Sequence, residues 1–283
     1  ITLYGDVVDQ RPVDWWTGEP VPGHFISVDE VLEDLEAVKG KESITFRLFS
    51  LGGDLYAGLA IKDRLQDLEA TTTVIVDGII ASAATVIAMG ADVIKSHPSD
   101  QIMMHEPSAS LFGYYSLSDL KEVEKNLNVG IKSLIETYSS KTGIDQEKVK
   151  NAIMSTTWMT GREAHDRGYV DELIEGETVD MALAADASRI TVNGFSQRLR
   201  GVRIPDGLPV RNDVTAKTFN RPSSKREEGG RKVYTTADEF RTECEDLYNQ
   251  IVQDAMSMGK AQGIAEENAR LKDIEAVQHT VND

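Results

Sequence analysis

The segment from Thr73 to Asp92 constrains the fold of this chain more than any other. Its first part, Val74–Val76, is a run of β-branched residues that is typical of a buried strand. Asp77-Gly78 is a turn signal, and from Ala81 the composition becomes rich in alanine, which favours a helix packed close to its neighbours. Ser82 is therefore expected where a strand turns into a helix.

A serine at such a corner has two interpretations. The corner can lift the hydroxyl out of the sheet, and the helix N-terminus supplies free N–H groups and a positive potential beside it. The simpler interpretation is that Ser82 only caps the helix. The segment alone does not decide between a nucleophile and a cap, so the remainder of the chain has to be weighed.

The first 176 residues alternate between strand and helix patterns. Strands are expected over Ile1–Val8, Ser43–Ser50, Thr71–Val76, Ala91–Lys95, Gln101–Met104 and near Leu173-Ile174. Helices are expected after the capping box Ser27–Glu30, after Asp54, over Leu117–Thr142 and Asp145–Met154, and from Thr160. This alternation predicts an α/β fold made of parallel β-α-β units that are covered on both faces.

One long connection interrupts this pattern near the N-terminus. Gln10–Gly23 contains three of the eight prolines and the pair Trp15-Trp16, which predicts a long loop or a hairpin flap. Adjacent tryptophans in a loop usually cover part of a core, so we expect both rings to pack back on the domain rather than to bind a partner.

The strand–helix alternation stops near residue 188, which gives a first domain of residues 1–188. Residues 189–235 are rich in Arg, Gly, Pro, Asn and Ser without clear periodicity and are interpreted as a basic, flexible linker. A capping box at Thr236–Glu239 and an apolar stripe then predict an acidic helical tail over residues 236–283. The excess of basic residues in 189–232 could suit nucleic acid or an acidic protein, but we interpret it as solvated and expect no nucleic-acid partner.

Composition excludes several classes of protein. No apolar run reaches the roughly 18 residues that a membrane span needs, and no signal peptide is recognised, so a cytoplasmic location without a membrane partner is expected. A single cysteine, Cys244, rules out a disulfide framework within one chain and fits a reducing compartment. The sequence has no Cys/His cluster of the zinc-binding kind, and we expect no metal and no cofactor.

Three features along the first domain suit nucleophilic catalysis. Ser82 is placed at its corner, His105 closes the apolar strand that begins at Ile102, and Gly52-Gly53 stands at a strand-to-helix junction. A serine becomes a competent nucleophile when a histidine removes its proton, and a strand end is a rigid place to hold that histidine. A glycine pair lets the backbone approach a substrate and turn N–H groups toward a developing oxyanion.

At these residues the sequence resembles a known family, the proteolytic subunit of Clp protease. The motifs that carry the resemblance are Ser50-Leu-Gly-Gly-Asp54, Asp77-Gly-Ile-Ile-Ala-Ser-Ala-Ala84, Met103-Met-His-Glu-Pro107, and Gly161-Arg-Glu-Ala164 with Gly168-Tyr-Val-Asp171. They occur in the family's order and cover roughly residues 1–176. The family consists of serine peptidases with a crotonase-type β-α superhelix. The chain is similar in particular to the phage head-maturation (prohead protease) branch, whose members carry a Thr-Trp pair as at Thr157-Trp158.

The resemblance implies a role for each matching residue. Ser82 would be the nucleophile and His105 the general base. The oxyanion hole would be formed by the N–H groups of Gly53 and Ala83, with Gly52 as an alternative donor. The resemblance further implies a homo-oligomer of two stacked rings of seven subunits, joined through the helix at 117–142, that acts on protein or peptide substrates.

The sequence departs from the family pattern at the third catalytic position. Thr157 stands where the family has an aspartate, and a threonine cannot balance the charge of an imidazolium. In a related triad, loss of that carboxylate's orienting role costs up to ~10⁴-fold in rate. The site would then work as a Ser-His dyad, or another acid such as Glu106 or Asp166 would take the place. His97 is a rival base, but it lies in a turn rather than at a strand end.

The function that the resemblance implies is an ATP-independent serine endopeptidase of phage head maturation. It would cleave scaffold or capsid protein inside the immature head, in the host cytoplasm. Two alternatives remain open from the sequence. One is a proteolytically weak structural ring that organises assembly, and the other is an acyl-CoA enzyme of the crotonase superfamily that uses the glycine-pair amides without a nucleophile.

Overall fold

The computed structural model describes residues 1–176, 180–199, 204 and 208–211. The chain divides into two units, Ile1–Phe219 and Asn220–Asp283. The predicted acidic tail over 236–283, and the part of the predicted linker that follows residue 211, lie outside the described residues. Those two predictions therefore stay predictions.

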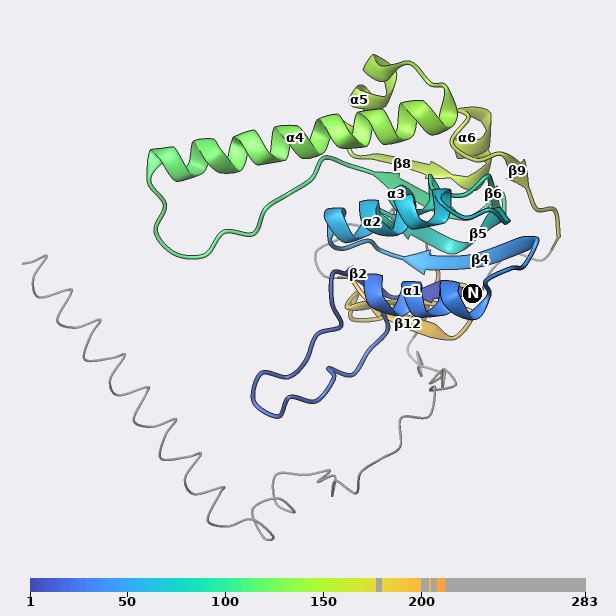
Figure 1. Cartoon of the computed structure of the whole chain (residues 1–283), viewed down its shortest axis with the longest axis horizontal. Helices are drawn as coiled ribbons and strands as arrows, with labels where there is room; N and C mark the ends of the chain where they lie inside the picture. Colours follow the sequence, from blue (N-terminus) through green and yellow to red (C-terminus); the bar gives the residue numbers. More distant parts are fainter. Residues whose placement is uncertain (177–179, 200–203, 205–207, 212–283) are drawn as a thin grey trace, which may run out of the picture. The chain divides into compact units, whose positions relative to one another are not determined.

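A seven-stranded sheet forms the centre of the first unit (Figure 1). Five strands run parallel in the order β1 (Thr2–Tyr4), β4 (Ser43–Ser50), β5 (Thr71–Ala81), β6 (Val93–Ser96) and β9 (Glu172–Leu173). Strand β7 (Gln101–Met104) continues beside the end of β5, and β8 (Thr157–Thr160) pairs with β7 in the antiparallel direction. The expected α/β architecture of parallel β-α-β units is confirmed.

Strand β5 is longer than the sequence pattern predicts. A turn is expected at Asp77-Gly78, but the strand continues through this pair to Ala81. Leu48 pairs with Val76 and Ser50 pairs with Ile80, so β5 has two more residues than β4 over this interval, and the extra residues form a bulge. Gly78 adopts φ +79°, which a glycine accepts without steric cost. The bulge lets β5 pair first with β6 and then with β7, and so carries the chain to Ser82.

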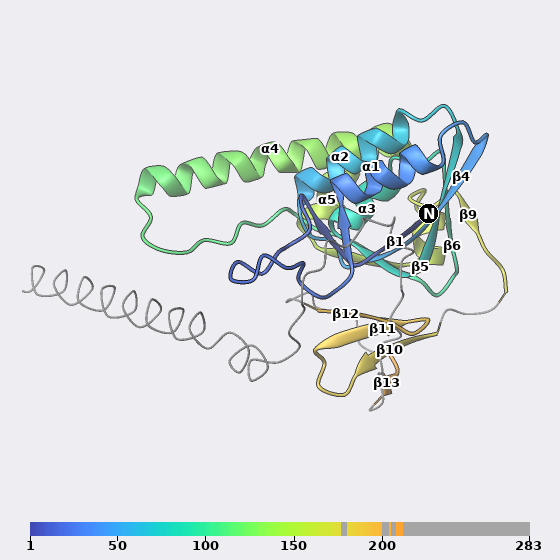
Figure 2. The same ribbon diagram turned by 60° about the horizontal axis from the view of Figure 1, so that its bottom comes forward.

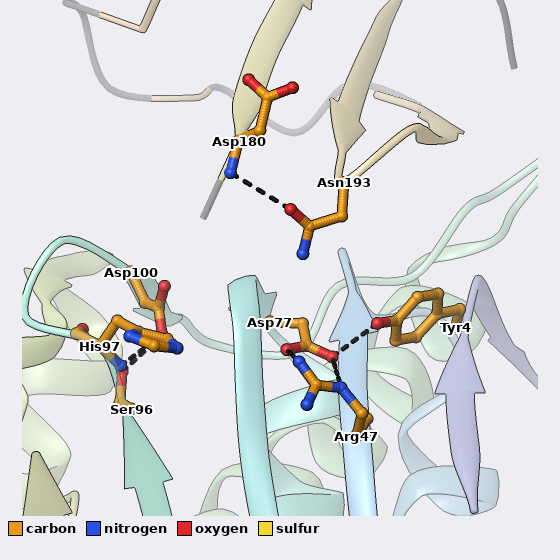
Figure 3. A network of polar contacts seen from close by, with 8 residues as sticks. All are labelled: Tyr4, Arg47, Asp77, Ser96, His97, Asp100, Asp180 and Asn193. Carbon is orange, nitrogen blue, oxygen red and sulfur yellow. Dashed lines mark hydrogen bonds and ion pairs between the residues drawn. The ribbon is translucent and has the colours of Figure 1, made fainter. Parts of the chain in front are cut away.

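The bulge also turns a carboxylate into the protein interior (Figure 3). Asp77 is fully buried and accepts hydrogen bonds from the Arg47 guanidinium, with Nε at 2.8 Å, and from the Tyr4 hydroxyl at 2.5 Å. Burial and the neighbouring Asp77 carboxylate raise the pKa of the Tyr4 hydroxyl. A buried charge needs such partners because it has lost its hydration. The three residues thereby tie β1, β4 and β5 together.

Three helices cover one face of the main sheet, and a second sheet lies on the other (Figure 2). The helices are α1 (Val28–Ala37), α2 (Leu55–Gln66) and α3 (Ala83–Ala88). Their apolar residues share one core with the inward side chains of β4 and β5, among them Phe46, Leu48, Val74 and Val76. Ser27 and Asp54 cap α1 and α2 through their side-chain oxygens, as the sequence predicts for Ser27.

The long helix α4 (Leu117–Thr142) has the predicted bounds. It begins with a capping box at Ser116 and ends at Gly143, whose φ of +71° suits a glycine C-cap. Its buried residues, Gly130, Leu134 and Tyr138, all lie in the C-terminal half. The N-terminal half extends away from the sheet (Figure 1). The short helices α5 (Gln146–Met154) and α6 (Gly161–Asp166) then lead to β8 and β9. No helix in the described part of the chain has the length and apolar character to cross a membrane.

A four-stranded sheet, here called the accessory sheet, spans the end of the predicted first domain and the first part of the predicted linker. Its strands are ordered β12 (Phe195–Arg198), β11 (Arg189–Val192), β10 (Met181–Ala184) and β13 (Val210–Arg211). The expectation that the first domain ends at 188 and a linker begins at 189 is therefore wrong for the described residues. Ile190 and Val192 alternate with polar residues, and both are buried against Phe49 and Ile79 of the main sheet. Asn193 and Gly194 have φ of +49° and +87°, as in the tight hairpin turn that Asn-Gly favours.

The loop between β2 (Asp6–Val8) and β3 (Phe25–Ser27) carries the two adjacent tryptophans. The expectation that they pack back on the domain is wrong, because Trp15 is 84% exposed and Trp16 45%. The rings pack edge-on against each other with centroids 4.8 Å apart. The carboxylate of Asp14 accepts hydrogen bonds from the N–H groups of Trp16 and Thr17, which fixes a tight turn at the tip. The local turn, rather than contact with a core, positions the rings.

Candidate active site

Ser82 is the single residue between β5 and α3. Its backbone has φ +56° and ψ −129°, a strained conformation for a residue with a side chain. Its N–H donates to the carbonyl of Met103 at 2.9 Å, which fixes the corner to β7. The side chain makes no capping hydrogen bond to α3. The interpretation of Ser82 as a simple helix cap is therefore wrong.

The Ser82 hydroxyl instead meets His105. The Nε2 atom of His105 lies 2.7 Å from the Oγ atom of Ser82. His105 follows directly after β7, which pairs with the last residues of β5, so the strand pairing sets the two residues side by side. Burial lowers the pKa of the His105 imidazole, and the nearby charge of Glu106 acts in the opposite direction. The lowered pKa favours the neutral imidazole, which is the form able to accept a proton.

The glycine pair approaches Ser82 from the end of β4. A Cβ atom on Gly52 would lie 2.6 Å from the Cβ of Ser82, and one on Gly53 would lie 2.1 Å from the carbonyl oxygen of Val7. Both glycines have positive φ, +90° and +150°. The Gly52 N–H donates to the Ser50 hydroxyl at 3.0 Å, so it is already engaged. Within the described residues the Gly53 N–H has no such partner, and Ala83 is the first residue of α3, where N–H groups lack intrahelical acceptors.

The third predicted residue is close in the sheet but not joined to His105. Thr157 pairs across the strands with Met104, the residue before His105. Its hydroxyl donates to the carbonyl of Ala152 at 2.8 Å and lies 3.2 Å from the Ser155 hydroxyl. Among the residues that the structure describes, the His105 ring has its one hydrogen bond with Ser82. The structure thus brings Ser82 and His105 together and leaves Thr157 beside them without a bond to the ring.

The other candidates named from the sequence lie apart from this pair or are exposed. Asp166 contacts His165 at 3.5 Å, and Glu106 has an exposed side chain. His97 lies in the turn between β6 and β7, where its backbone N–H donates to the buried carboxylate of Asp100 at 2.7 Å (Figure 3). His97 therefore belongs to a turn that supports β7.

Two cavities meet at the Ser82–His105 pair. The first, of about 320 Å³, extends under α4 and includes Leu127, Leu134 and Tyr138 in its lining. The second, of about 710 Å³, is bounded by residues of β2, by Trp158 and by the accessory sheet. Its lining residues from the accessory sheet and the loop after it are Arg198 and Leu199. Neither residue is among those predicted from the sequence, and the Asn193-Gly194 hairpin signal is the feature that could have indicated them.

The chain matches a known protein family and several known proteins. The sequence model of the family described as Clp protease matches residues 25–177, more than half of the chain. Two relatives are named "ATP-dependent Clp protease proteolytic subunit 1". The protein from Chlamydia abortus is 30% identical over 142 residues, which cover 50% of this chain and 74% of the relative. The protein from Chlamydia caviae is 28% identical over 176 residues, which cover 60% and 92%.

A solved structure shows the same fold. It is that of a ClpP1 mutant from Listeria monocytogenes, with a TM-score of 0.51 and 22% sequence identity. The match covers 62% of this chain and 91% of that one. The family match ends at residue 177, so the accessory sheet lies beyond it. From the family match and these relatives, the chain is a serine-type peptidase that belongs to the Clp protease family.

Proposed function

We propose that Ser82 is the nucleophile and His105 the general base of an ATP-independent endopeptidase that cleaves scaffold or capsid proteins during phage head maturation. The observation that carries the catalytic assignment is the 2.7 Å contact between Ser82 Oγ and His105 Nε2. A neutral imidazole at this distance is within reach of the hydroxyl proton.

The reaction follows from this geometry. His105 takes the proton from Ser82 as Oγ attacks the carbonyl carbon of the scissile peptide bond, and it returns the proton to the leaving amine. The Gly53 and Ala83 N–H groups flank Ser82 and stabilise the oxyanion of the tetrahedral intermediate. Water then hydrolyses the acyl-enzyme by the same proton transfers. The peptide occupies the two cavities that meet at Ser82.

The assignment to head maturation rests on the Thr157-Trp158 pair, which resembles the phage branch of the family, and on chain beyond the family match that could direct the enzyme to an assembling shell. We propose that the subunits form two stacked rings joined through α4, whose N-terminal half exposes Leu117 and Leu120. Peptide hydrolysis should then proceed without ATP or an ATPase partner, in the host cytoplasm and within the immature head.

One observation favours a second candidate function, a structural ring with weak proteolysis. The hydroxyl of Thr157 is bonded to Ala152, so the imidazolium that forms during acylation lacks a carboxylate partner at this position. Without that partner the site would run as a dyad with a lower rate. The two candidates differ in turnover and not in fold.

The direct test uses a fluorophosphonate probe and a set of short peptides, without ATP. We expect the wild-type protein to be labelled at Ser82 and to hydrolyse peptides, and Ser82→Ala to do neither. Ser99→Ala, in the turn before β7, is the matched control and should behave as wild type. Peptide turnover that survives Ser82→Ala would refute the assignment, and absence of labelling in the wild type would favour the structural ring.

The proposed substrate is tested separately. Co-expression of the chain with a phage capsid protein and its scaffold should shorten one of them, as read from intact masses. The Ser82→Ala variant should leave both masses unchanged. Peptide hydrolysis without any change in the two masses would retain the peptidase and reject the role in head maturation.

A further inference from the structure

Gln197 in β12 connects the accessory sheet to the loop that leads to the glycine pair. Its side-chain Oε1 accepts a hydrogen bond from the N–H of Leu51 at 3.2 Å. Its Nε2 donates to the carboxylate of Asp6 in β2 at 2.8 Å. The side chain is buried, with 6% of its surface exposed. One amide group therefore satisfies two partners that are 191 and 146 residues away in the sequence.

The loop held by Gln197 is the one that carries Gly52 and Gly53. Leu51 immediately precedes the pair. Its side chain is buried in the cluster that lies between the main sheet and the accessory sheet. Val7, next to Asp6, donates its N–H to the carbonyl of Gly52 at 2.9 Å and accepts from the N–H of Asp54 at 2.9 Å. Gln197 thus forms hydrogen bonds both with the loop and with β2, the strand whose Val7 is bonded to that loop.

Glycine residues with positive φ do not fix their own conformation, because glycine has many accessible backbone states. The direction of the Gly53 N–H therefore depends on the hydrogen bonds around the loop. Those bonds come from Ser50, from Val7 and, through Leu51, from Gln197. Of these three, Ser50 lies within residues 25–177, the segment that matches the Clp protease family, and Val7 precedes it, while Gln197 alone comes from the accessory sheet.

We propose that Gln197 is a positioning residue for the oxyanion hole, and that the accessory sheet is thereby part of the catalytic unit rather than an appendage. This inference rests on the proposed function, because it needs the Gly53 N–H to act on the substrate. The sheet has a second consequence for the same cleft, since Arg198 and Leu199 line the larger cavity beside Ser82.

The test compares four variants of the full-length chain. Gln197→Met keeps the length of the side chain and removes both hydrogen bonds. Ser196→Ala is the matched control: the residue is the neighbour in β12, it is buried, and its hydroxyl lacks a partner among the described residues. Gln197→Glu retains an acceptor for Leu51 but places a carboxylate against Asp6. Adding Asp6→Asn to it restores a donor and an acceptor across that contact.

The oxyanion develops only on the way to the transition state. A misplaced Gly53 N–H should therefore lower kcat rather than raise KM. We expect kcat to fall about 10- to 100-fold in Gln197→Met and Gln197→Glu, with KM within about twofold of wild type. Ser196→Ala should keep the wild-type kcat. The double variant Asp6→Asn/Gln197→Glu should recover most of the loss that Gln197→Glu causes.

Hydrogen exchange of peptides that span Leu51–Asp54 gives a readout that does not depend on catalysis. Exchange should be faster in Gln197→Met than in Ser196→Ala, with equal melting temperatures as the check on folding. Unchanged exchange would overturn the positioning role whatever the activity. Faster exchange with an unchanged kcat would overturn the link to the oxyanion. Turnover that persists in Ser82→Ala would instead refute the proposed function, while the exchange result would still report on the loop.

Discussion

The side-chain hydroxyl of Thr157 donates a hydrogen bond to the carbonyl of Ala152, at 2.8 Å. This bond ties the start of β8 to the end of α5, and it directs the hydroxyl to the backbone. Thr157 nevertheless stands opposite Met104, one residue from His105. The backbone thus places position 157 beside the imidazole, while the side chain found there is used for a structural contact.

We therefore expect Thr157→Asp to raise peptidase activity. A carboxylate beside His105 would stabilise the imidazolium that forms during acylation, and it should recover at least about tenfold of the ~10⁴-fold attributed to such a group. Because the carboxylate raises the pKa of His105, the acidic limb of the rate profile should move to higher pH. The measurement is kcat/KM against pH.

The control for this prediction is Thr157→Asn, which has the same shape without the charge. Both variants lack the Thr157 hydroxyl that donates to Ala152, so the loss of that hydroxyl is common to the two. Equal rates and equal pH profiles for the two variants would place residue 157 outside the catalytic site.

The strained backbone at Ser82 predicts that glycine at this position stabilises the fold, although the activity is lost. A φ of +56° with a side chain costs on the order of 1–3 kcal/mol, and glycine avoids this cost. Ser82→Gly should therefore be more stable than Ser82→Ala by about 1 kcal/mol, and both variants should be inactive. Denaturant unfolding of the two variants provides the comparison. A glycine variant that is less stable than the alanine variant would mean that the corner is not strained.

The sequence was enough to predict the order of strands and helices in the main sheet and the grouping of the candidate site residues. The bounds of the helix at 117–142 followed from its apolar spacing and from Gly143, and the structure has the same bounds. That Ser82, His105 and the glycine pair lie close together could be predicted because each stands at the end of a strand of one sheet. Local sequence signals and sheet topology favour the same arrangement here.

The incorrect predictions concern segments in which long-range contacts override the local sequence signals. Asp77-Gly78 has the composition of a turn, but Arg47 and Tyr4 bind the Asp77 carboxylate and the strand continues past it. The accessory sheet was missed because its strands are short and carry polar residues. Their burial is created by Phe49 and Ile79, which are more than 100 residues earlier in the chain. Neither contact can be derived from local periodicity.

The pH dependence of peptide hydrolysis follows from the environment of His105. Burial lowers the pKa of the imidazole, and the base must be neutral to act, so activity should persist below the ordinary histidine pKa of about 6.5 and be lost at lower pH. The charge of Glu106 opposes this shift. Glu106→Gln should therefore move the acidic limb of kcat/KM to still lower pH. Glu33→Gln, on the exposed face of α1, is the control and should leave the limb in place. A limb that moves upward in Glu106→Gln would contradict this electrostatic account.

The buried Asp77 carboxylate makes a prediction about stability. Arg47→Met removes the cation and leaves the fully buried charge with the Tyr4 hydroxyl as its remaining side-chain donor. Stranding a buried charge typically costs 3–5 kcal/mol, and we expect about 3 kcal/mol because Arg47 is half exposed. The double variant Arg47→Met/Asp77→Leu should recover most of this loss. The measurement is the free energy of unfolding of each variant. An Arg47→Met variant as stable as wild type would show that the ion pair does not stabilise the fold.

The last prediction concerns the boundary of the folded unit. Arg189 and Arg198 would be early trypsin sites in a flexible linker, but the structure places them in β11 and β12, paired with each other across the strands. The bond after Arg198 is further held by the N–H of Leu199, which donates to the carbonyl of Ser188 at 3.0 Å. We therefore expect both bonds to survive limited digestion of the native protein, as read from fragment masses under denaturing conditions.

A variant of the hairpin turn sharpens this test. Gly194→Val forces a β-branched residue into a φ of +87°, which costs on the order of 1–3 kcal/mol and should open the hairpin. Cleavage after Arg189 and Arg198 should then accelerate, while digestion within the main sheet stays slow. If the wild-type chain is instead cut first after Arg189, leaving a core of residues 1–189, the accessory sheet does not form in solution. The simpler interpretation of this segment as a linker would then be restored.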